Sequence, residues 1–340
     1  MQDPEDNTEI PQCTLKMFPE ETLHCVEWAR DKFSKLFTQN AQSALKILDE
    51  GEKINTVSQQ DLQVLRVGLK LLKKRPKNFM DCVEYARMKF EKLFNHSAKQ
   101  LIHVYPLDAK TKEGNLFWSL PKRPPTPVEF DKDNMLHCSF INAIACLRAN
   151  IFHIEIPSKA PRTDEFKKQV GEMAKAFKPK EFIPDDSKAN EIKQSVNKEA
   201  AAKEEEKKDE EVKEETEQLD PNDVQSLLQE FLILHKQLKG EVKKSFELSV
   251  IKPEEFEKDN DSNFHIDFIY SSANIRASCY KLDIMDWITV KLKAGRIVPA
   301  LATTTASIAV LQSLELVKIL KGCKLEEFRN CFLKLAVPSI

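Results

Sequence analysis

The feature that most constrains the fold of this chain is a helical segment that occurs twice. The thirteen residues CVEWARDKFSKLF at 25–37 return 57 positions later as CVEYARMKFEKLF at 82–94, and ten of the thirteen positions are identical. In both copies the apolar residues recur near i, i+3 or i+4, and i+7, which is the pattern of an amphipathic helix. The chain is therefore predicted to be largely helical, with both copies packed into its core.

A second internal repeat links the middle of the chain to its end. FDKDN at 130–134 precedes His137, FEKDN at 256–260 precedes His265, and the spacing from each histidine to a Phe-Ile pair and to a later Arg-Ala pair is identical. Both copies are expected to be acidic loops that open a buried helix, with an arginine near its far end. We interpret the two histidines as satisfied helix-start residues rather than as catalytic bases.

Composition limits the classes of partner and of site. Lys plus Arg number 52 against 54 Asp plus Glu in 340 residues, which argues against nucleic acid or an anionic membrane surface as a partner. No apolar run reaches the roughly 18 residues of a membrane span, so a soluble intracellular protein is expected. The eight cysteines are scattered, and no histidines stand at metal-ligand spacing. Neither a disulfide scaffold nor a metal site is predicted, and most of the cysteines are expected to fill the core.

The composition changes twice after the second repeat begins. Residues 198–218 are dense in Glu and Lys and contain no aromatic residue, so they are predicted to be a solvated helix or a disordered insertion. An amphipathic helix at 227–238 is expected to rejoin the fold. Beyond it, 294–320 is predicted to be a loop and a buried helix, and 328–338 a strand. The chain contains no glycine-rich phosphate-binding loop.

Several motifs, taken in order, resemble those of the ubiquitin-activating enzyme family. Cys13-Thr14-Leu15-Lys16, followed by Phe18-Pro19, looks like the catalytic-cysteine motif of that family. Further matches follow in the order of the family: Phe117-Trp118, PKRP at 121–124, FEKDNDSNFHIDFI at 256–269, ANIRA at 273–277 and IVPALATTTA at 297–306. FEKLFNH at 90–96 and Pro106-Leu107-Asp108 are most similar to the dual-specificity branch of the family in animals.

The resemblance implies a mainly α fold with a partial α/β segment at its end. It assigns 1–184 to a helical catalytic-cysteine domain, 185–222 to a charged linker or insertion, 223–250 to a helix that rejoins the cysteine domain, and 251–340 to an incomplete ThiF-like adenylation domain. The nucleotide loop and magnesium-binding aspartate of that domain, and the ubiquitin-fold domain of the family, have no match here. We therefore expect a fragment, either a truncated gene product or part of a longer chain.

The chemistry of the family, carried over by resemblance, assigns roles to five residues. Cys13 would take the acyl group of adenylated ubiquitin, or of a ubiquitin-like modifier, as a thioester. Thr14 would donate to the developing oxyanion, and Lys16 would favour the thiolate. Asp133 and Asn134 would help to orient the acyl group.

The same resemblance implies the cofactors and partners. ATP and Mg²⁺ would serve the full-length enzyme, with their binding residues missing from this chain. The partners would be the modifier, a ubiquitin-conjugating enzyme and the missing adenylation half, in the cytoplasm and also in the nucleus. The alternative is a non-catalytic module that binds ubiquitin or the parent enzyme. A cysteine protease is disfavoured, because no histidine stands in a recognisable motif.

Overall fold

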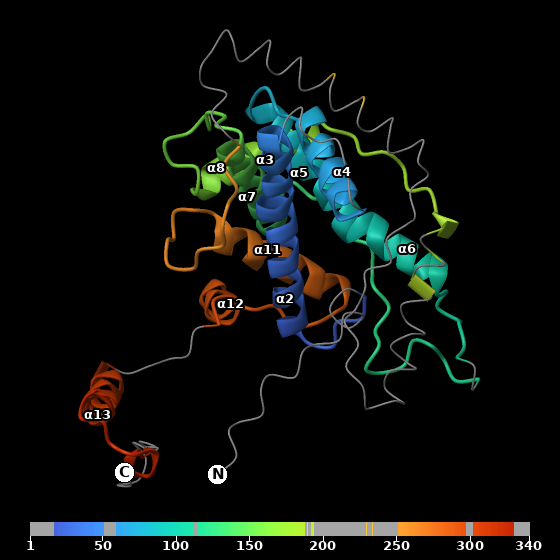
Figure 1. Cartoon of the computed structure of the whole chain (residues 1–340). Helices are drawn as coiled ribbons and strands as arrows, with labels where there is room; N and C mark the ends of the chain where they lie inside the picture. The colour runs from blue at the N-terminus through green and yellow to red at the C-terminus, as the bar shows by residue number, and fades with distance from the viewer. Residues whose placement is uncertain are drawn as a thin grey trace. The chain divides into compact units, whose positions relative to one another are not determined.

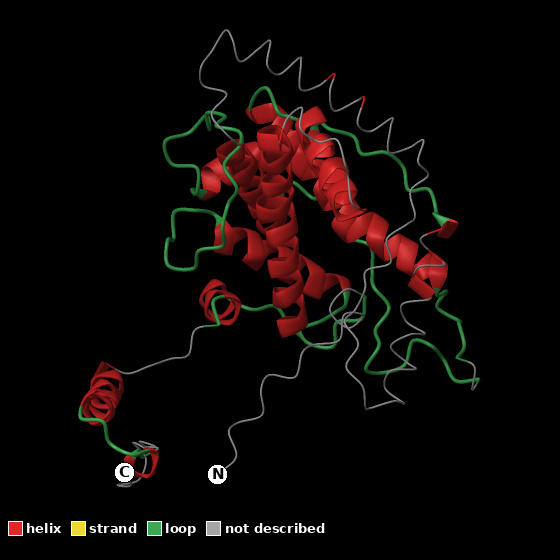
Figure 2. Cartoon of the chain, in the orientation of Figure 1, coloured by secondary structure: helices red, strands yellow, loops and turns green. Residues whose placement is uncertain are grey.

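The computed structural model describes residues 17–50, 59–111, 114–187, 251–296 and 302–329, with isolated positions between 189 and 233. The chain divides into two units, Met1–Gly295 and Arg296–Ile340. Regular structure in the described part is helical, apart from one antiparallel bridge between Lys110 and Leu116 (Figure 2). The prediction of a mainly α fold is therefore confirmed.

Helices of the first unit pack in pairs that are distant in sequence. They are α2 (Thr22–Phe33), α3 (Asn40–Glu50), α4 (Gln59–Lys73), α5 (Phe79–Phe90), α6 (Ser97–Val104), α7 (Met135–Ile151), α8 (Asp164–Lys175), α11 (His265–Cys279) and α12 (Trp287–Ala294) (Figure 1). Helix α2 packs against α11, α5 packs against α7, and α7 packs against α11. The helix of the first thirteen-residue copy, α2, therefore pairs with α11, the helix that begins at His265. The helix of the second copy, α5, pairs with α7, which contains His137 in its first turn.

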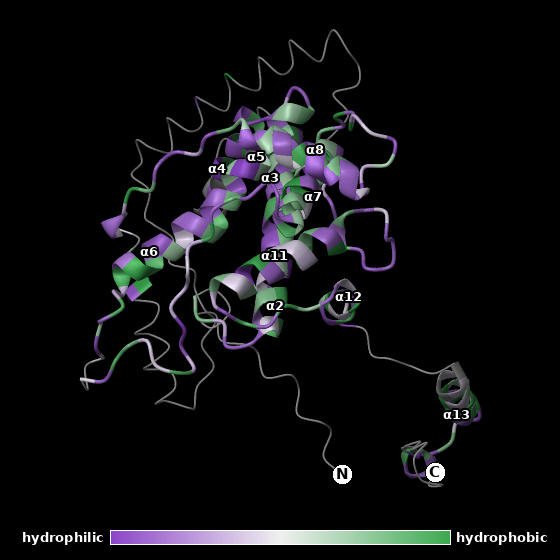
Figure 3. Ribbon diagram, turned by 180° about the vertical axis from the view of Figure 1, so that it is seen from behind, coloured by the Kyte–Doolittle hydropathy of each residue, from purple (hydrophilic) through white to green (hydrophobic). Residues whose placement is uncertain are grey.

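Local sequence explains where several of these helices begin. The side chains of Asn78, Asn134, Thr163 and Asp286 precede α5, α7, α8 and α12, and each accepts a hydrogen bond from a backbone N–H of the first turn. Such caps satisfy donors that the helix itself leaves unpaired. The helical ribbons carry both hydrophilic and hydrophobic residues (Figure 3), as expected for helices with one face in the core.

The two sequence repeats form two equivalent sets of contacts in the core. The ring of Phe33 lies 4.7 Å from that of His265, and the ring of Phe90 lies 4.8 Å from that of His137. The Nδ1 atom of His265 accepts from the Glu257 backbone N–H at 3.0 Å, as that of His137 does from Asp131 at 3.1 Å. Both histidines are thus satisfied at helix starts, as the sequence indicated.

The equivalence extends to backbone geometry beyond the histidine helices. His153 follows α7 and Lys281 follows α11, and both have a φ of 54° in the left-handed region. The next residues close the same turn: Ile154 N–H donates to the Ala149 carbonyl at 2.8 Å, and Leu282 N–H donates to the Ala277 carbonyl at 2.9 Å. The first unit therefore contains an internal duplication with matching caps, rings and turns.

Each thirteen-residue copy ends in a π-helical stretch that the periodicity did not predict. Ser34–Gln39 (η1) joins α2 to α3, and Glu91–His96 (η3) joins α5 to α6. A π-helical turn shifts the register of the side chains that follow it. Phe37 and Phe94, which lie in these turns, pack at 5.2 Å on Phe268 and at 5.0 Å on Phe140.

The described part of the second unit is the helix α13 (Ala302–Leu320) with a short 3-10 turn, Leu325–Glu327. A helix within the predicted segment 294–320 is therefore confirmed. The prediction that this helix is buried is wrong, because its described side chains are exposed or partly exposed, those of Val310, Leu314 and Val317 among them. The predicted segments at 198–218 and 227–238 lie outside the described residues, except for positions 229 and 233. The predicted strand at 328–338 is described only at its first two residues.

Candidate functional site

The sequence-predicted site residues fall in two places. Cys13, Thr14 and Lys16 lie outside the described residues, which begin at Met17. Asp133 and Asn134 are described, and they form the turn before α7. The described residue nearest to Cys13 in the chain is therefore Met17, and its surroundings show how the segment that carries Cys13 joins the fold.

That entry point is fixed by one hydrogen bond and one aromatic cluster. The hydroxyl of Tyr280, just after α11, donates to the Met17 carbonyl at 2.7 Å. Phe18 is 3% exposed and packs with Leu101 and Phe117. The ring centroids of Phe117 and Trp118 lie 5.7 and 5.9 Å from that of Phe18. The chain that leads back to Cys13 therefore leaves from a buried anchor.

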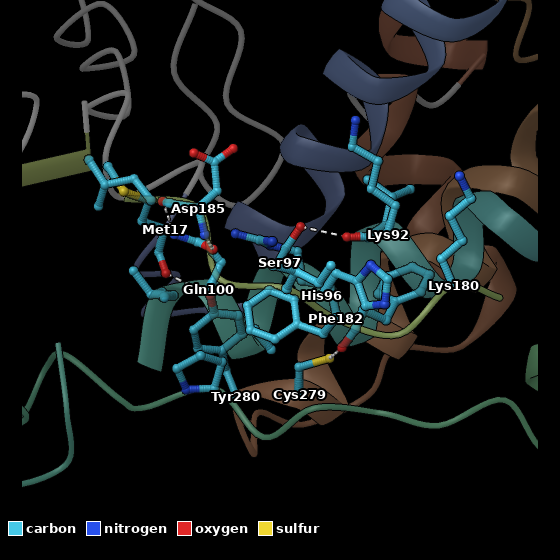
Figure 4. Close-up of a pocket in the computed structure, with 18 of the residues that line it drawn as sticks. Met17, Lys92, His96, Ser97, Gln100, Lys180, Phe182, Asp185, Cys279 and Tyr280 are labelled. Carbon is cyan, nitrogen blue, oxygen red and sulfur yellow. Dashed lines mark hydrogen bonds between the residues drawn. The ribbon is translucent and has the colours of Figure 1, made fainter. Parts of the chain in front are cut away.

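A cavity of about 550 Å³ lies beside this anchor (Figure 4). Its wall consists of residues from α11 and its end, from η3 and α6, and from a crossing segment at 180–185, with Met17 at one edge: Met17, Lys92, Leu93, Phe94, His96, Ser97, Ala98, Gln100, Leu101, Pro125, Lys180, Glu181, Phe182, Ile183, Asp185, Ile192, Arg276, Cys279 and Tyr280. A cavity of this size with a mixed apolar and polar lining is typical of a binding site.

The crossing segment is held over the cavity by a buried glutamine of α6. The Gln100 side chain donates through Nε2 to the Asp185 carbonyl at 2.8 Å and accepts from the Asp185 backbone N–H at 3.0 Å. This is the hydrogen-bonding pattern of a short strand pair, made by one side chain. Within the segment, the ring of Phe182 lies 5.7 Å from that of His96.

Charge at the α11 end of the cavity is positive. The guanidinium of Arg276 lies 4.4 Å from the ring of Trp28 and 5.2 Å from that of Tyr280, which are cation–π distances. Burial raises the pKa of Tyr280 to about 12, so the Tyr280 hydroxyl keeps its proton and stays a donor to Met17 near neutral pH.

The second predicted group, Asp133 and Asn134, has different neighbours. The Asn134 side chain caps α7 by accepting from the backbone N–H groups of Leu136 and His137. The carboxylate of Asp133 is 80% exposed and lies 3.5 Å from the Lys132 ammonium, which also bonds Glu172 of α8. Among the described contacts, none links this turn to Met17. The catalytic roles of these two residues remain predictions.

Cysteines of the described chain lie mostly in the core. Cys25, Cys82, Cys138, Cys146 and Cys279 are buried, and Cys323 is partly exposed. Burial raises the pKa of Cys25 to about 11 and that of Cys82 and Cys279 to about 12, and it also raises the pKa of Cys138 and Cys146. A thiol with so high a pKa is a poor nucleophile, because the thiolate is the reacting species. The prediction that most cysteines fill the core is confirmed for these five.

Sequence reasoning did not single out Tyr280 or Gln100 as site residues. For Tyr280 a signal was available from the internal duplication. Phe152 precedes Tyr280 by 128 residues, the same separation as His137 and His265, so a hydroxyl is present at only one of two equivalent positions. For Gln100 the partner is a backbone 85 residues away, and nothing in the local pattern points to it.

No helix among the described residues is long and apolar enough to cross a membrane. In the same residues, no group of three or more His, Cys, Asp or Glu side chains could hold a metal ion.

Comparison with known proteins gives one consistent family. The family model described as "Ubiquitin-activating enzyme, SCCH domain" matches residues 19–291. The chain is 36% identical over 343 residues to human ubiquitin-like modifier-activating enzyme 6, covering 98% of this chain and 30% of that protein.

Two further relatives give the same picture. Ubiquitin-activating enzyme E1 1 of Candida albicans is 34% identical over 347 residues, covering 100% of the chain and 31% of that protein. Human ubiquitin-like modifier-activating enzyme 1 is 33% identical over 345 residues, covering 99% of the chain and 29% of that protein. The chain thus spans about three tenths of the length of these relatives.

Proposed function

The chain belongs to the ubiquitin-activating enzyme family, and from that membership we propose that Cys13 accepts the C-terminal acyl group of ubiquitin, or of a ubiquitin-like modifier, as a thioester. The observation that carries this proposal is the family match over residues 19–291, directly after the Cys13-Thr14-Leu15-Lys16 segment. The acyl group would then pass to a ubiquitin-conjugating enzyme.

Elimination among the cysteines supports the choice of Cys13. Five described cysteines are buried, with thiol pKa values raised by burial. Three others remain: Cys13, Cys323 in the second unit, and Cys331. Of these, only Cys13 has both a threonine next to it and a lysine three residues on, as in the motif that the chain shares with the family.

The anchor at Met17 also supports the proposal. Cys13 is four residues from Met17, and four residues of extended chain span at most about 14 Å. Cys13 is therefore within that distance of the hydrogen bond between Tyr280 and Met17. A nucleophile tethered beside a cavity of about 550 Å³ has a place for a bound acyl substrate.

The proposed step balances without a redox partner. The Cys13 thiolate attacks the carbonyl carbon of the acyl adenylate, the C–S bond forms, the bond to the phosphate oxygen breaks, and AMP leaves. The Thr14 hydroxyl would donate to the oxyanion, and the Lys16 ammonium would stabilise the thiolate. Asp133 and Asn134 would orient the acyl group.

ATP and Mg²⁺ would serve the adenylation that precedes this step. The described residues do not fit that pair, because they contain no group of three or more His, Cys, Asp or Glu that could hold a metal ion. The chain also has no glycine-rich phosphate loop. The adenylation step is therefore assigned to an adenylation half supplied in cis or as a partner.

The proposal is tested by mixing the full chain with ubiquitin adenylate and looking for a thiol-sensitive adduct. The adduct is expected with the native chain and with Cys323→Ala, which removes a partly exposed thiol, and is expected to be lost with Cys13→Ala. An unchanged adduct in Cys13→Ala would contradict the assignment. Binding of ubiquitin with no adduct, even beside a complete adenylation domain, would favour the non-catalytic module instead.

A further inference from the structure

A second cavity, of about 540 Å³, lies along α5, η3 and α6. Two non-helical stretches, 129–130 and 179–182, form part of its wall, and the residues 180–182 also line the cavity beside Met17. The helical side of the wall is a row of polar side chains at four-residue spacing: Arg87, Glu91, Asn95 and Lys99. The cavity therefore lies between a polar helix face and two pieces of non-helical chain.

The amide of Asn95 in this row is only half used. Its Nδ2 donates to the Val128 carbonyl at 3.4 Å, whereas its Oδ1 is buried and has no hydrogen-bond partner among the described residues. The whole residue is 1% exposed. A buried acceptor in a folded protein nearly always has a partner, because leaving it without one costs free energy. The partner that Asn95 lacks is an N–H or O–H donor.

The internal duplication shows that the fold does not require this acceptor. Thr38 occupies the position of Asn95 in the other half, 57 residues earlier. Its hydroxyl donates to the Glu254 carbonyl, as the Asn95 amide does to the Val128 carbonyl. In both halves the residue that accepts this bond also donates its backbone N–H, at 3.1 Å, to the carbonyl just before the threonine or asparagine. One hydroxyl donor is therefore enough for the structural bond, and the Oδ1 of Asn95 is additional.

Charge in the cavity is balanced. Arg87 and Glu91 are paired at 2.8 Å, so their charges offset each other. Besides His96, the charged side chains of the described wall are three bases and three acids: Arg87, Lys99, Lys180, Glu91, Glu129 and Glu181. Since electrostatic complementarity decides which ligand a site prefers, this wall favours a neutral ligand over a polyanion or a cation.

We propose that this cavity binds a segment of a partner polypeptide through its main chain, with a backbone N–H of that segment donating to Asn95 Oδ1. A peptide main chain is neutral and carries one N–H donor on each residue other than proline. Gln100, five residues further along, already makes such a contact within the chain. Its side-chain amide accepts from the Asp185 backbone N–H at 3.0 Å and donates to the Asp185 carbonyl at 2.8 Å.

The test measures binding of acetyl-tetraalanine amide to the full ¹⁵N-labelled chain, followed at the backbone amide signals of Phe130 and Phe182. A saturable shift of these signals is expected. The same peptide with its N–H groups methylated should bind at least about fivefold more weakly, because it keeps its carbonyls and cannot donate to Asn95. This comparison uses the native chain, so it does not depend on the folding of a variant.

A matched pair of variants tests the residue itself. Asn95→Thr repeats the threonine of position 38 and should weaken binding of acetyl-tetraalanine amide about fivefold. Its urea midpoint should stay native or rise, because a buried acceptor without a partner has been removed. Thr38→Ser, a change at the equivalent position of the other half, should leave binding unchanged.

Three results would overturn the proposal. The first is the absence of a saturable shift in the native chain, which would leave a bound water as the partner of Asn95. The second is equal binding of the methylated and unmethylated peptides. The third is full retention of binding in Asn95→Thr.

Discussion

Replacement of Tyr280 by phenylalanine tests the anchor of the cysteine segment. The change removes only the hydroxyl that donates to the Met17 carbonyl at 2.7 Å. A phenyl ring is sterically compatible with this position of the fold, because Phe152 occupies the equivalent position after α7. The variant should therefore fold, with the loss confined to one hydrogen bond.

The magnitude follows from the burial of that hydroxyl. Tyr280 is 5% exposed, so the bond forms away from bulk water. A hydrogen bond of this kind contributes about 1 kcal/mol net, and such a loss makes release of Met17 about fivefold more frequent. We expect the free energy of unfolding to fall by about 1 kcal/mol and thioester formation at Cys13 to slow, since the tethered thiol is less often in place.

The assay combines urea unfolding with amide hydrogen exchange at Met17 and Phe18. Exchange at these two amides should accelerate in Tyr280→Phe and remain native-like in a control, Thr22→Val, which removes a different hydroxyl bond to the chain after α11. If stability falls in Tyr280→Phe while exchange at Met17 and Phe18 is unchanged, the hydroxyl does not anchor the segment and the reasoning is wrong.

Three other outcomes are expected. Burial lowers the pKa of His137, so as the pH falls through about 6.5 the unfolded chain takes up a proton before the folded one and stability is lost. Urea midpoints measured at falling pH should show this loss, and the loss should be smaller in His137→Gln. Equal slopes of urea midpoint against pH in the native chain and the variant would contradict this expectation. A Cβ at Gly68 would lie 2.7 Å from Ile47 Cδ1 and 2.9 Å from the Ser43 carbonyl, so Gly68→Ala should destabilise by about 1–2 kcal/mol, overpacking of α3 on α4 exceeding the gain in helix propensity; a higher urea midpoint would rule this out. In the native chain iodoacetamide should label Cys323 far faster than the five buried thiols, as read by peptide mass spectrometry. The five are Cys25, Cys82, Cys138, Cys146 and Cys279. Labelling of any buried thiol at a rate comparable to that of Cys323 would show that the core opens.

Much of the local structure was predictable because it depends on residues close in sequence. The periodicity of 25–37 and 82–94 predicted two amphipathic helices, and both helices form. The loops before His137 and His265 predicted two helix starts, and Asn134 caps the first of them. The far-end arginine of the first copy contacts a carbonyl, that of Lys74, as its position near a helix end indicated.

The candidate site was predictable only in part. The motif around Cys13 identified the nucleophile by resemblance, but the groups that anchor its segment come from elsewhere in the chain. Tyr280 lies 263 residues from Met17, and Gln100 lies 85 residues from Asp185. Contacts of this range depend on which helices pair, and periodicity specifies that a helix has a buried face without specifying its partner.

The sequence by itself determined the helices, their caps and the existence of two repeats, because these depend on propensity and spacing within a few turns. Only the tertiary structure decided which copies of the two repeats pack together, with α2 on α11 and α5 on α7. That pairing brings Lys74 and Lys89 to Arg148 and brings Met17 to Tyr280. The physical reason is that the burial of apolar faces is non-directional, so the choice of partner is made by the packing of the whole core.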